Sequence, residues 1–162
     1  MSVIHASRPP HALLGAALAL LLLAGCPASL ERSPAEEPEG WVRIGTSEVA
    51  VEIADTPAKQ ARGLGYRDRL DWDTGMYFAY PRAVMPSFWM KGMRFSIDIV
   101  WIRDGRIVDV HDNVPFEPRG NGPTVRPREA TDAVLEVPAG YRQANGWRIG
   151  DRVRFERTGA SS

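Results

Sequence analysis

The sequence predicts a mainly β fold: a compact antiparallel β-sandwich or barrel with one short helix, after a signal peptide and a disordered tether. Two observations support this prediction. After residue 40, short runs that alternate between apolar and polar side chains, or are apolar throughout, are separated by Gly and Pro residues. Only the segment 56–63 has helix signals, with Thr56-Pro57 at its start and Gly63 at its end. Such spacing is typical of a sandwich or barrel.

The strands are expected where the apolar pattern is continuous. Val49, Val51 and Ile53 share one face of their run, which is the alternation of a half-buried strand. The expected strands are 48–53, 76–80, 87–90, 97–102, 107–111, 133–137 and 152–155. A chain of 162 residues has room for one such domain, which we place at residues 41–157, with a disordered tail at 158–162.

Residues 1–25 are predicted to be a signal peptide. Arg8 precedes an apolar run over 12–24 that contains seven leucines. As a helix, these 13 residues would span about 20 Å, short of the roughly 30 Å hydrocarbon core of a bilayer. The run is therefore typical of a signal peptide and is too short for a permanent spanning helix.

The end of this run, Leu23-Ala24-Gly25-Cys26, resembles the lipobox of bacterial lipoproteins. The resemblance implies that Cys26 becomes the mature N-terminus and carries a diacylglycerol thioether, so that the chain is held on a membrane by its lipid. Cys26 is the only cysteine, so a disulfide within the chain is excluded. The alternative is an ordinary signal peptide in which Cys26 has no part. By resemblance to envelope sorting rules, Pro27 slightly favours the outer membrane over the inner one, facing the periplasm or exterior.

Residues 26–40 are predicted to be a tether. Between Pro27 and Gly40 the chain has three prolines, four glutamates and no aromatic residue. Such a segment buries too little apolar area to offset its ordering entropy. In extended form it would hold a domain up to about 40 Å from the bilayer.

The composition excludes several classes of protein. The chain has 20 basic and 20 acidic side chains, so it lacks the basic excess of nucleic-acid binders, and we expect no nucleic-acid partner. It has neither a Gly-x-Ser-x-Gly motif nor the paired cysteines or clustered histidines of metal sites. We therefore expect no cofactor and no metal.

The segment from Ile97 to His111 is predicted to form a central hairpin. Asp104-Gly105 suits a two-residue type I′ turn. This turn predicts that Ile102 faces Ile107 and that Asp98 faces His111 at the open end. An acid and an imidazole placed in this way can form a hydrogen bond or ion pair with each other, which is the simpler role. The alternative is that they act as a general base and the group that orients it.

The segment from Asp112 to Thr131 has four prolines and no periodic pattern. Long connections of this kind in compact domains are usually functional or mobile, so it is a candidate lid or binding loop. The alternative is that it covers an edge of the sheet.

The candidate ligand-binding residues are polar or aromatic side chains in apolar surroundings. The run 88–91 places Trp89 beside Lys91, and strand alternation cannot bury Phe88, Trp89 and Met90 together, so one side should line a pocket. Core packing is the simpler role for the aromatic and methionine side chains nearby. The full set of candidates is Arg62, Trp89, Lys91, Asp98, His111 and Glu136.

The order of motifs is similar to the family catalogued as domain of unknown function 192. The matching pieces, over about residues 48–155, are Gln60-Ala61-Arg62-Gly63-Leu64, Gly75-Met76-Tyr77-Phe78, Phe88-Trp89-Met90-Lys91, Ile97-Asp98-Ile99, Gly105-Arg106-Ile107-Val108, Val134-Leu135-Glu136-Val137 and Gly150-Asp151. The resemblance implies a compact β-sandwich or barrel with one short helix. This chain departs from the family at Gly65 and at Gly92-Met93, where members usually have Met and Asn-Thr.

We expect a lipid-anchored accessory or binding protein of the cell envelope, without catalytic activity and with a pocket around Arg62, Trp89, Lys91 and Asp98. The two basic side chains favour a small anionic or hydroxylated ligand. One alternative is a structural envelope component that binds another protein through an exposed aromatic face. Another is a hydrolase that uses Asp98 with His111, or Asp98 with Glu136 facing it across a cleft.

Overall fold

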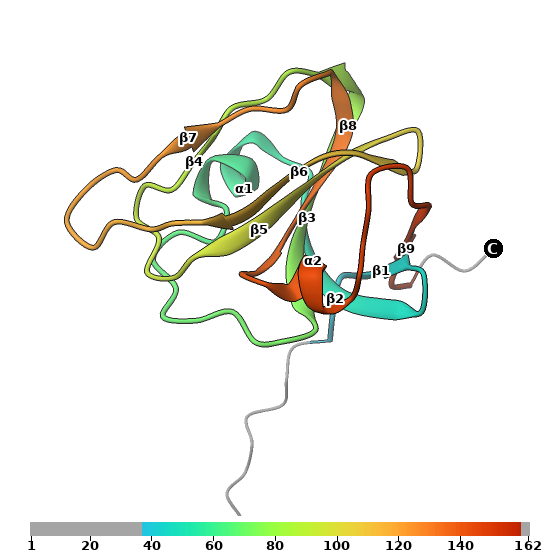
Figure 1. Cartoon of the computed structure of the whole chain (residues 1–162), viewed down its shortest axis with the longest axis horizontal. Helices are drawn as coiled ribbons and strands as arrows, with labels where there is room; N and C mark the ends of the chain where they lie inside the picture. Colours follow the sequence, from blue (N-terminus) through green and yellow to red (C-terminus); the bar gives the residue numbers. More distant parts are fainter. Residues whose placement is uncertain (1–36, 160–162) are drawn as a thin grey trace, which may run out of the picture. The chain divides into compact units, whose positions relative to one another are not determined.

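The computed structural model describes residues 37–159, which form a small β-barrel with two short helices (Figure 1). The predicted signal peptide, Cys26 and most of the predicted tether lie outside the described residues. The strands are β1 (Gly40–Ile44), β2 (Ser47–Ala54), β3 (Thr74–Val84), β4 (Phe88–Trp89), β5 (Ile97–Arg103), β6 (Arg106–Val114), β7 (Thr124–Val125), β8 (Thr131–Pro138) and β9 (Val153–Arg157). The helices are α1 (Pro57–Arg62) and α2 (Tyr141–Ala144).

Seven strands form one sheet in the order β6-β5-β8-β3-β2-β1-β9, and β4 and β7 form a separate pair. The first and last strands of the large sheet meet at a bridge between Arg106 and Arg152, which closes the barrel. Three backbone hydrogen bonds support this seam: the amides of Ile107, Gly150 and Val153 donate to the carbonyls of Asp151 at 3.0 Å, Ile107 at 2.8 Å and Gly105 at 2.8 Å, respectively. Closure removes the exposed edges that an open sheet would leave.

The mainly β prediction is confirmed, but the sheet is mixed and not wholly antiparallel, and the described residues form two short helices and not one. All pairs in the large sheet are antiparallel except β2 and β3, which are parallel and connected through α1. The predicted helix forms over Pro57–Arg62, where the Thr56 hydroxyl accepts a hydrogen bond from the Lys59 amide at 3.3 Å. The short helix α2 and the strands β1 and β7 were not among the predicted elements.

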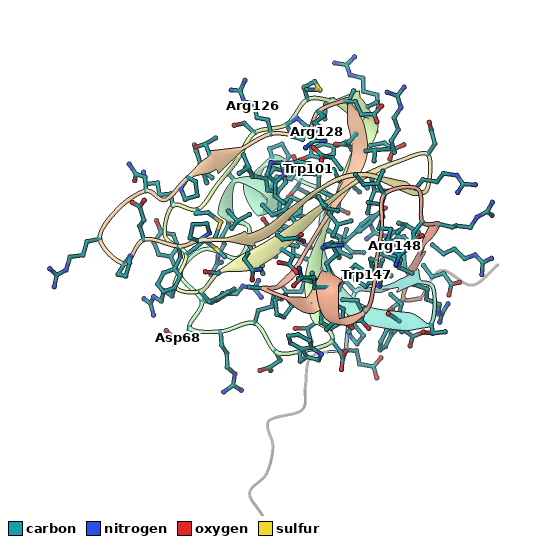
Figure 2. All side chains as sticks on the ribbon, in the orientation of Figure 1. Asp68, Trp101, Arg126, Arg128, Trp147 and Arg148 are labelled. Atoms are coloured by element: carbon teal, nitrogen blue, oxygen red, sulfur yellow. The ribbon has the colours of Figure 1, made fainter. Side chains whose placement is uncertain are left out.

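The two faces of the sheet carry separate apolar clusters. Figure 2 shows Trp101 and Trp147 well apart, and each belongs to a different cluster. The outer cluster, which α1 and the β4–β7 pair cover, consists of Ala54, Leu64, Met76, Phe78, Met90, Met93, Ile97, Ile99, Trp101, Val114 and Val134. Phe88 of β4 packs edge-on against both Phe78 and Trp101, with ring centroids 4.7 and 5.2 Å apart.

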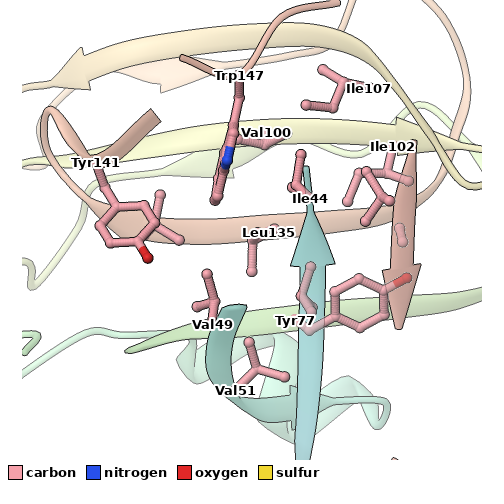
Figure 3. Packing of buried hydrophobic residues seen from close by; sticks show 14 residues of the cluster. Ile44, Val49, Val51, Tyr77, Val100, Ile102, Ile107, Leu135, Tyr141 and Trp147 are labelled. Atoms are coloured by element: carbon pink, nitrogen blue, oxygen red, sulfur yellow. The ribbon is translucent and has the colours of Figure 1, made fainter. Parts of the chain in front are cut away.

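The inner cluster fills the barrel (Figure 3). Its members are Val42, Ile44, Val49, Val51, Tyr77, Val100, Ile102, Ile107, Ala133, Leu135, Val137, Tyr141, Trp147 and Val153. Tyr141 and Trp147 are fully buried, and their polar atoms have partners: the Tyr141 hydroxyl donates to Asp73 at 2.7 Å, and the Trp147 indole donates to Ser47 at 3.2 Å. The barrel therefore has a packed interior, and a ligand site must lie elsewhere.

The predicted hairpin forms, but its predicted register is wrong beyond the turn. Asp104 and Gly105 have φ values of 49° and 66°, as a type I′ turn requires, and Ile102 faces Ile107. Beyond this pair Trp101 faces Asp109, so Val108 is an extra residue in a bulge. Without the bulge, Asp109 would point into the apolar barrel.

Because of the bulge, the Asp109 side chain points away from the apolar interior and forms hydrogen bonds. Its carboxylate accepts from the backbone amides of Val110 at 2.9 Å and Arg128 at 3.0 Å. Val110 then packs against the inner cluster and Val108 against the outer one. A second irregularity near Asn113, whose φ is 48°, completes the change of register.

The segment from Asp112 to Thr131 packs against the outer cluster through Phe116 and Val125, so it covers a face of the sheet and not the edge that its second predicted role named. Its Thr124–Val125 strand pairs with Phe88–Trp89, and the Met90 amide donates to the Pro123 carbonyl at 3.1 Å. Gly122 has a φ of +62°, and a Cβ placed there would lie 2.5 Å from the Met90 Cβ. Because Gly122 has no Cβ, the segment can lie directly against Met90, the residue that follows β4.

Candidate functional site

A pocket of about 350 Å³ lies on the outer face of the sheet, between the α1 segment, the β4 segment and strands β3 and β8. This volume suits a small molecule. Its lining residues are Gln60, Ala61, Arg62, Gly63, Leu64, Gly65, Phe78, Tyr80, Pro86, Ser87, Phe88, Trp89, Lys91, Met93 and Glu136. Four of the six residues predicted from the sequence thus lie in one pocket: Arg62, Trp89, Lys91 and Glu136.

Glu136 is the buried polar group of this pocket. Strand alternation sends its neighbours Leu135 and Val137 into the barrel and Glu136 to the outer face, where it pairs with Met76 and Ile99 on the flanking strands. Only 6% of the residue is exposed, and its Oε2 atom has no hydrogen-bond partner among residues 37–159. A buried polar atom of this kind is costly unless another group satisfies it.

Burial raises the pKa of Glu136 to about 8, because removal from water disfavours the charged form. The Arg67 guanidinium lowers this pKa in turn, but only partly, because Arg67 forms a two-point ion pair with Glu52. Tyr80 is also affected: burial, and then the nearby Glu136, raise the pKa of its hydroxyl to about 12. At neutral pH the pocket therefore holds an uncharged carboxyl and an uncharged phenol.

The α1 segment is fixed over the sheet by Gln60. Its side-chain amide donates to the carbonyls of Ala54 at 3.1 Å and Ala79 at 3.2 Å, which lie on the parallel strands β2 and β3. After the helix, Gly63 takes a positive φ of 49° and the chain turns so that Leu64 is buried in the outer cluster. This geometry places Arg62 at one side of the pocket.

The β4 segment forms the opposite wall. Phe88 faces the outer cluster while Trp89, its neighbour, is 61% exposed and also lines the pocket. The predicted accessible side of this aromatic run is therefore present. The Tyr66 amide donates to the Gly92 carbonyl at 2.8 Å, which connects the segments that follow α1 and β4.

The charges around the pocket divide into paired and unpaired side chains. Within residues 37–159, neither Arg62 nor Lys91 forms an ion pair with an acidic side chain. By contrast, Lys59 pairs with Glu39 at 2.9 Å and Arg67 pairs with Glu52. The pocket thus has two cationic side chains that remain available to a ligand.

Asp98 and His111 lie outside this pocket, and the structure does not bring them together. Asp98 points with Val100 toward the inner face, whereas Glu136 points outward, so the predicted arrangement of two facing carboxylates is wrong. His111 faces Ile99 instead of Asp98, and its Nδ1 accepts a hydrogen bond from the Trp101 indole at 2.8 Å. The residues proposed for hydrolysis therefore do not form a constellation.

The Asp98 side chain instead forms hydrogen bonds with the backbone. Its two carboxylate oxygens accept from the amides of Asn113 at 2.8 Å and Arg142 at 3.0 Å, so that one buried side chain fixes the end of β6 and the start of α2. This is the satisfied role that is usual for a buried acid.

Sequence reasoning did not single out several lining residues as site residues, notably Gln60, Tyr80 and Ser87. Gln60 stood in the first of the family motifs, which was the available signal for it. Tyr80 and Ser87 flank a stretch whose path depends on contacts distant in sequence, and no local pattern marks them.

Two further findings bear on the expectations about metals and membranes. Among the residues that the structure describes, no group of three His, Cys, Asp or Glu side chains is arranged to hold a metal ion. No helix within residues 37–159 is both long and apolar enough to pass through a bilayer.

The fold and site together define a small closed β-barrel with a packed interior and a lateral pocket on its outer face. The family profile described as Uncharacterized ACR, the domain of unknown function 192, matches residues 41–155. The chain belongs to this family, as its motifs predict.

The barrel is similar to two solved structures. One comes from Sinorhizobium meliloti and is described as a proposed transcription regulator; it is 28% identical, with a TM-score of 0.64 over 72% of this chain and 91% of that chain. The other is a protein of unknown function from Novosphingobium aromaticivorans, 30% identical, with a TM-score of 0.63 over 71% of this chain and 82% of that chain. Comparison with curated proteins gave no significant match.

Replacing Asp98 tests its structural role. Asp98→Ala leaves two buried backbone amides without acceptors, so we expect the free energy of unfolding to fall by about 2–4 kcal/mol in urea titrations. Asp68→Ala is the matched control, because the Asp68 side chain is 86% exposed and pairs only at the surface with Arg94; its cost should stay below about 1 kcal/mol. Equal effects of the two changes would contradict the structural role.

Replacing Glu136 tests its raised pKa. Because the carboxyl titrates near pH 8 in the folded chain and near its ordinary value of 4.5 when unfolded, the folded state binds more protons between these values, and stability falls as the pH rises through this window. Glu136→Gln does not titrate. We expect its stability relative to wild type to rise between pH 5 and pH 8.5, by on the order of 3 kcal/mol, in urea unfolding. A constant difference would show that burial leaves this pKa unchanged.

Proposed function

We propose that this protein is a lipid-anchored binding or accessory protein of the cell envelope, whose pocket holds a small hydroxylated or anionic ligand without transforming it. The observation that carries the binding role is the buried Glu136 carboxyl, which has an unpartnered oxygen at a pocket open to solvent. A ligand with a hydrogen-bonding group would satisfy this oxygen. The lipid anchor rests on the resemblance of the sequence around Cys26 to a lipobox.

The residues in the pocket support binding over catalysis. General acid–base chemistry on a substrate usually needs a second group that takes or returns the proton. In the described structure Glu136 has no second carboxylate and no histidine beside it in the pocket, since Asp98 and His111 are engaged elsewhere. The lining offers aromatic surface, two cations and one uncharged carboxyl, which is the composition of a recognition site.

Protein binding is the second candidate. Tyr66, Met85 and Trp89 are each more than half exposed, and each lines the pocket or adjoins a residue that does. Exposed aromatic and Met side chains are common where a partner protein docks. The description of the Sinorhizobium structure as a proposed transcription regulator suggests nucleic acid as a partner, but the equal numbers of basic and acidic side chains in this chain do not favour it.

Replacing Cys26 tests the anchor. We expect wild-type protein expressed with its full signal peptide to sediment with membranes and to incorporate labelled palmitate. Cys26→Ser should lose the label and move to the soluble fraction, because stable attachment requires acyl chains. A conservative change in the tether, Ser29→Thr, serves as the control and should stay on the membrane. Retention of Cys26→Ser on membranes would overturn the anchor.

Replacing Trp89 tests the pocket. We expect saturation-transfer NMR on the full-length protein in detergent to show signals from the low-molecular-weight fraction of a bacterial cell envelope. Trp89→Ala should weaken these signals at least fivefold, because it removes the exposed wall of the pocket. Trp72→Ala is the matched control, since Trp72 is 53% exposed but does not line the pocket. Equal signals from both variants would overturn binding at this site.

A further inference from the structure

We infer that the occupant of this pocket is a small acidic sugar: a hydroxylated ring whose carboxylate lies against Arg62 and Lys91 and one of whose hydroxyls bonds Glu136. The inference rests on the proposed binding function and names its ligand class. Three features of the lining carry it: the buried acid, the unpaired cations and the aromatic wall. Each selects a different part of the ligand.

The buried acid selects a hydroxyl. Within residues 37–159, Glu136 Oε2 has no hydrogen-bond partner, and the cation that lowers its pKa, Arg67, is itself paired with Glu52. At neutral pH the carboxyl is uncharged, since burial raises its pKa to about 8. An uncharged carboxyl both donates and accepts a hydrogen bond, and a sugar hydroxyl does the same. The two groups therefore complement each other without burying a charge.

The unpaired cations select a carboxylate. Arg62 comes from the end of α1, and Lys91 follows β4, so the two charges approach the pocket from opposite walls. Both side chains are exposed and lack acidic partners within residues 37–159. Charge-assisted hydrogen bonds to a carboxylate are stronger than neutral ones. The same charges repel an ammonium group, which argues against a cationic ligand.

The aromatic wall selects a ring. Phe78, Tyr80, Phe88 and Trp89 all line the pocket, and the Trp89 side chain is largely accessible. A large, rigid aromatic surface packs well against the apolar C–H face that a sugar ring presents. The volume of about 350 Å³ accommodates one or two such rings.

The groups near Glu136 on the neighbouring elements determine how ligand binding depends on pH. Tyr80 on β3 and Arg67 in the loop after α1 interact electrostatically with Glu136, and Arg62 and Lys91 line the same pocket. On the β5 side its neighbour is the apolar Ile99. The pKa of Glu136, about 8, lies between pH 6 and pH 9, whereas that of Tyr80, about 12, lies above this range.

The experiment compares three probes that share one ring: glucuronate, glucose and glucosamine, which carry an anionic, a neutral and a cationic group. Calorimetric titration uses the full-length protein in detergent. At pH 7 we expect glucuronate to bind at least tenfold more tightly than glucose, and glucosamine to bind weakest. The affinity for glucuronate should fall about tenfold between pH 6 and pH 9 as Glu136 ionises.

Variants separate the two contributions. Glu136→Gln should show the same affinity for glucuronate at pH 6 and pH 9, because an amide does not titrate. Lys91→Ala should lower the affinity for glucuronate five- to tenfold and leave that for glucose unchanged. Lys59→Ala is the matched control, since Lys59 is the only other lysine of the chain, pairs with Glu39 and does not line the pocket; it should change neither affinity.

Several results would overturn the inference: no binding of glucuronate, equal affinity for glucuronate and glucose, or an affinity for glucuronate that rises with pH. Tighter binding of glucose or glucosamine, abolished by Trp89→Ala, would overturn the acidic sugar while leaving a functional pocket. The proposed function fails by different results, namely Cys26→Ser retained on membranes or envelope-fraction signals insensitive to Trp89→Ala.

Discussion

The alternation of β8 is the constraint on which the rest of the structure depends. Leu135 and Val137 fill the barrel, and the residue between them must point the other way. That residue is Glu136, so a carboxyl lies under the α1 and β4 segments instead of in solvent. Gly75 keeps this arrangement tight, because a Cβ at that position would lie 2.5 Å from the Glu136 carbonyl. The barrel and the pocket are thus set by one strand.

The acidic side chains illustrate how the same residue type serves different ends in this fold. Asp98 and Asp109 are buried and accept hydrogen bonds from backbone amides, and Asp109 also lies 3.7 Å from Nε of Arg128. Glu136 is buried with an unpartnered oxygen and responds by a raised pKa. Glu52 and Glu39 are exposed and hold cations away from the pocket. Of these five, only Glu136 has a buried side-chain oxygen without a hydrogen-bond partner in the described residues.

The sequence predicted those features that depend on neighbours along the chain. The α1 helix, the Asp104-Gly105 turn and the exposed side of the Phe88-Trp89 run follow from local patterns. The register of β6 does not, because it depends on keeping Asp109 out of an apolar interior built by distant strands. The role of Asp98 likewise depends on Arg142, whose amide lies 44 positions further along the chain.

For the candidate site, too, the sequence predicted the residues that local patterns mark but not how the fold brings them together. Glu136 drew notice as an acid in an apolar strand, and Lys91 as a charge beside aromatic residues. Arg62 joins them in one pocket because Gln60 fixes α1 across two parallel strands. A parallel pair requires a crossover connection, and turn signals in the sequence do not reveal which strands it joins.

The strands of the barrel are joined less extensively at the seam between Arg106 and Arg152 than elsewhere. It is joined by a single bridge with few hydrogen bonds, whereas the other neighbouring strands share at least five paired positions. In strand order this seam lies at the far ends of the sheet from β8 and β3, which bear the pocket. Local opening of the barrel at this seam would therefore begin at strands other than β8 and β3, which carry the pocket.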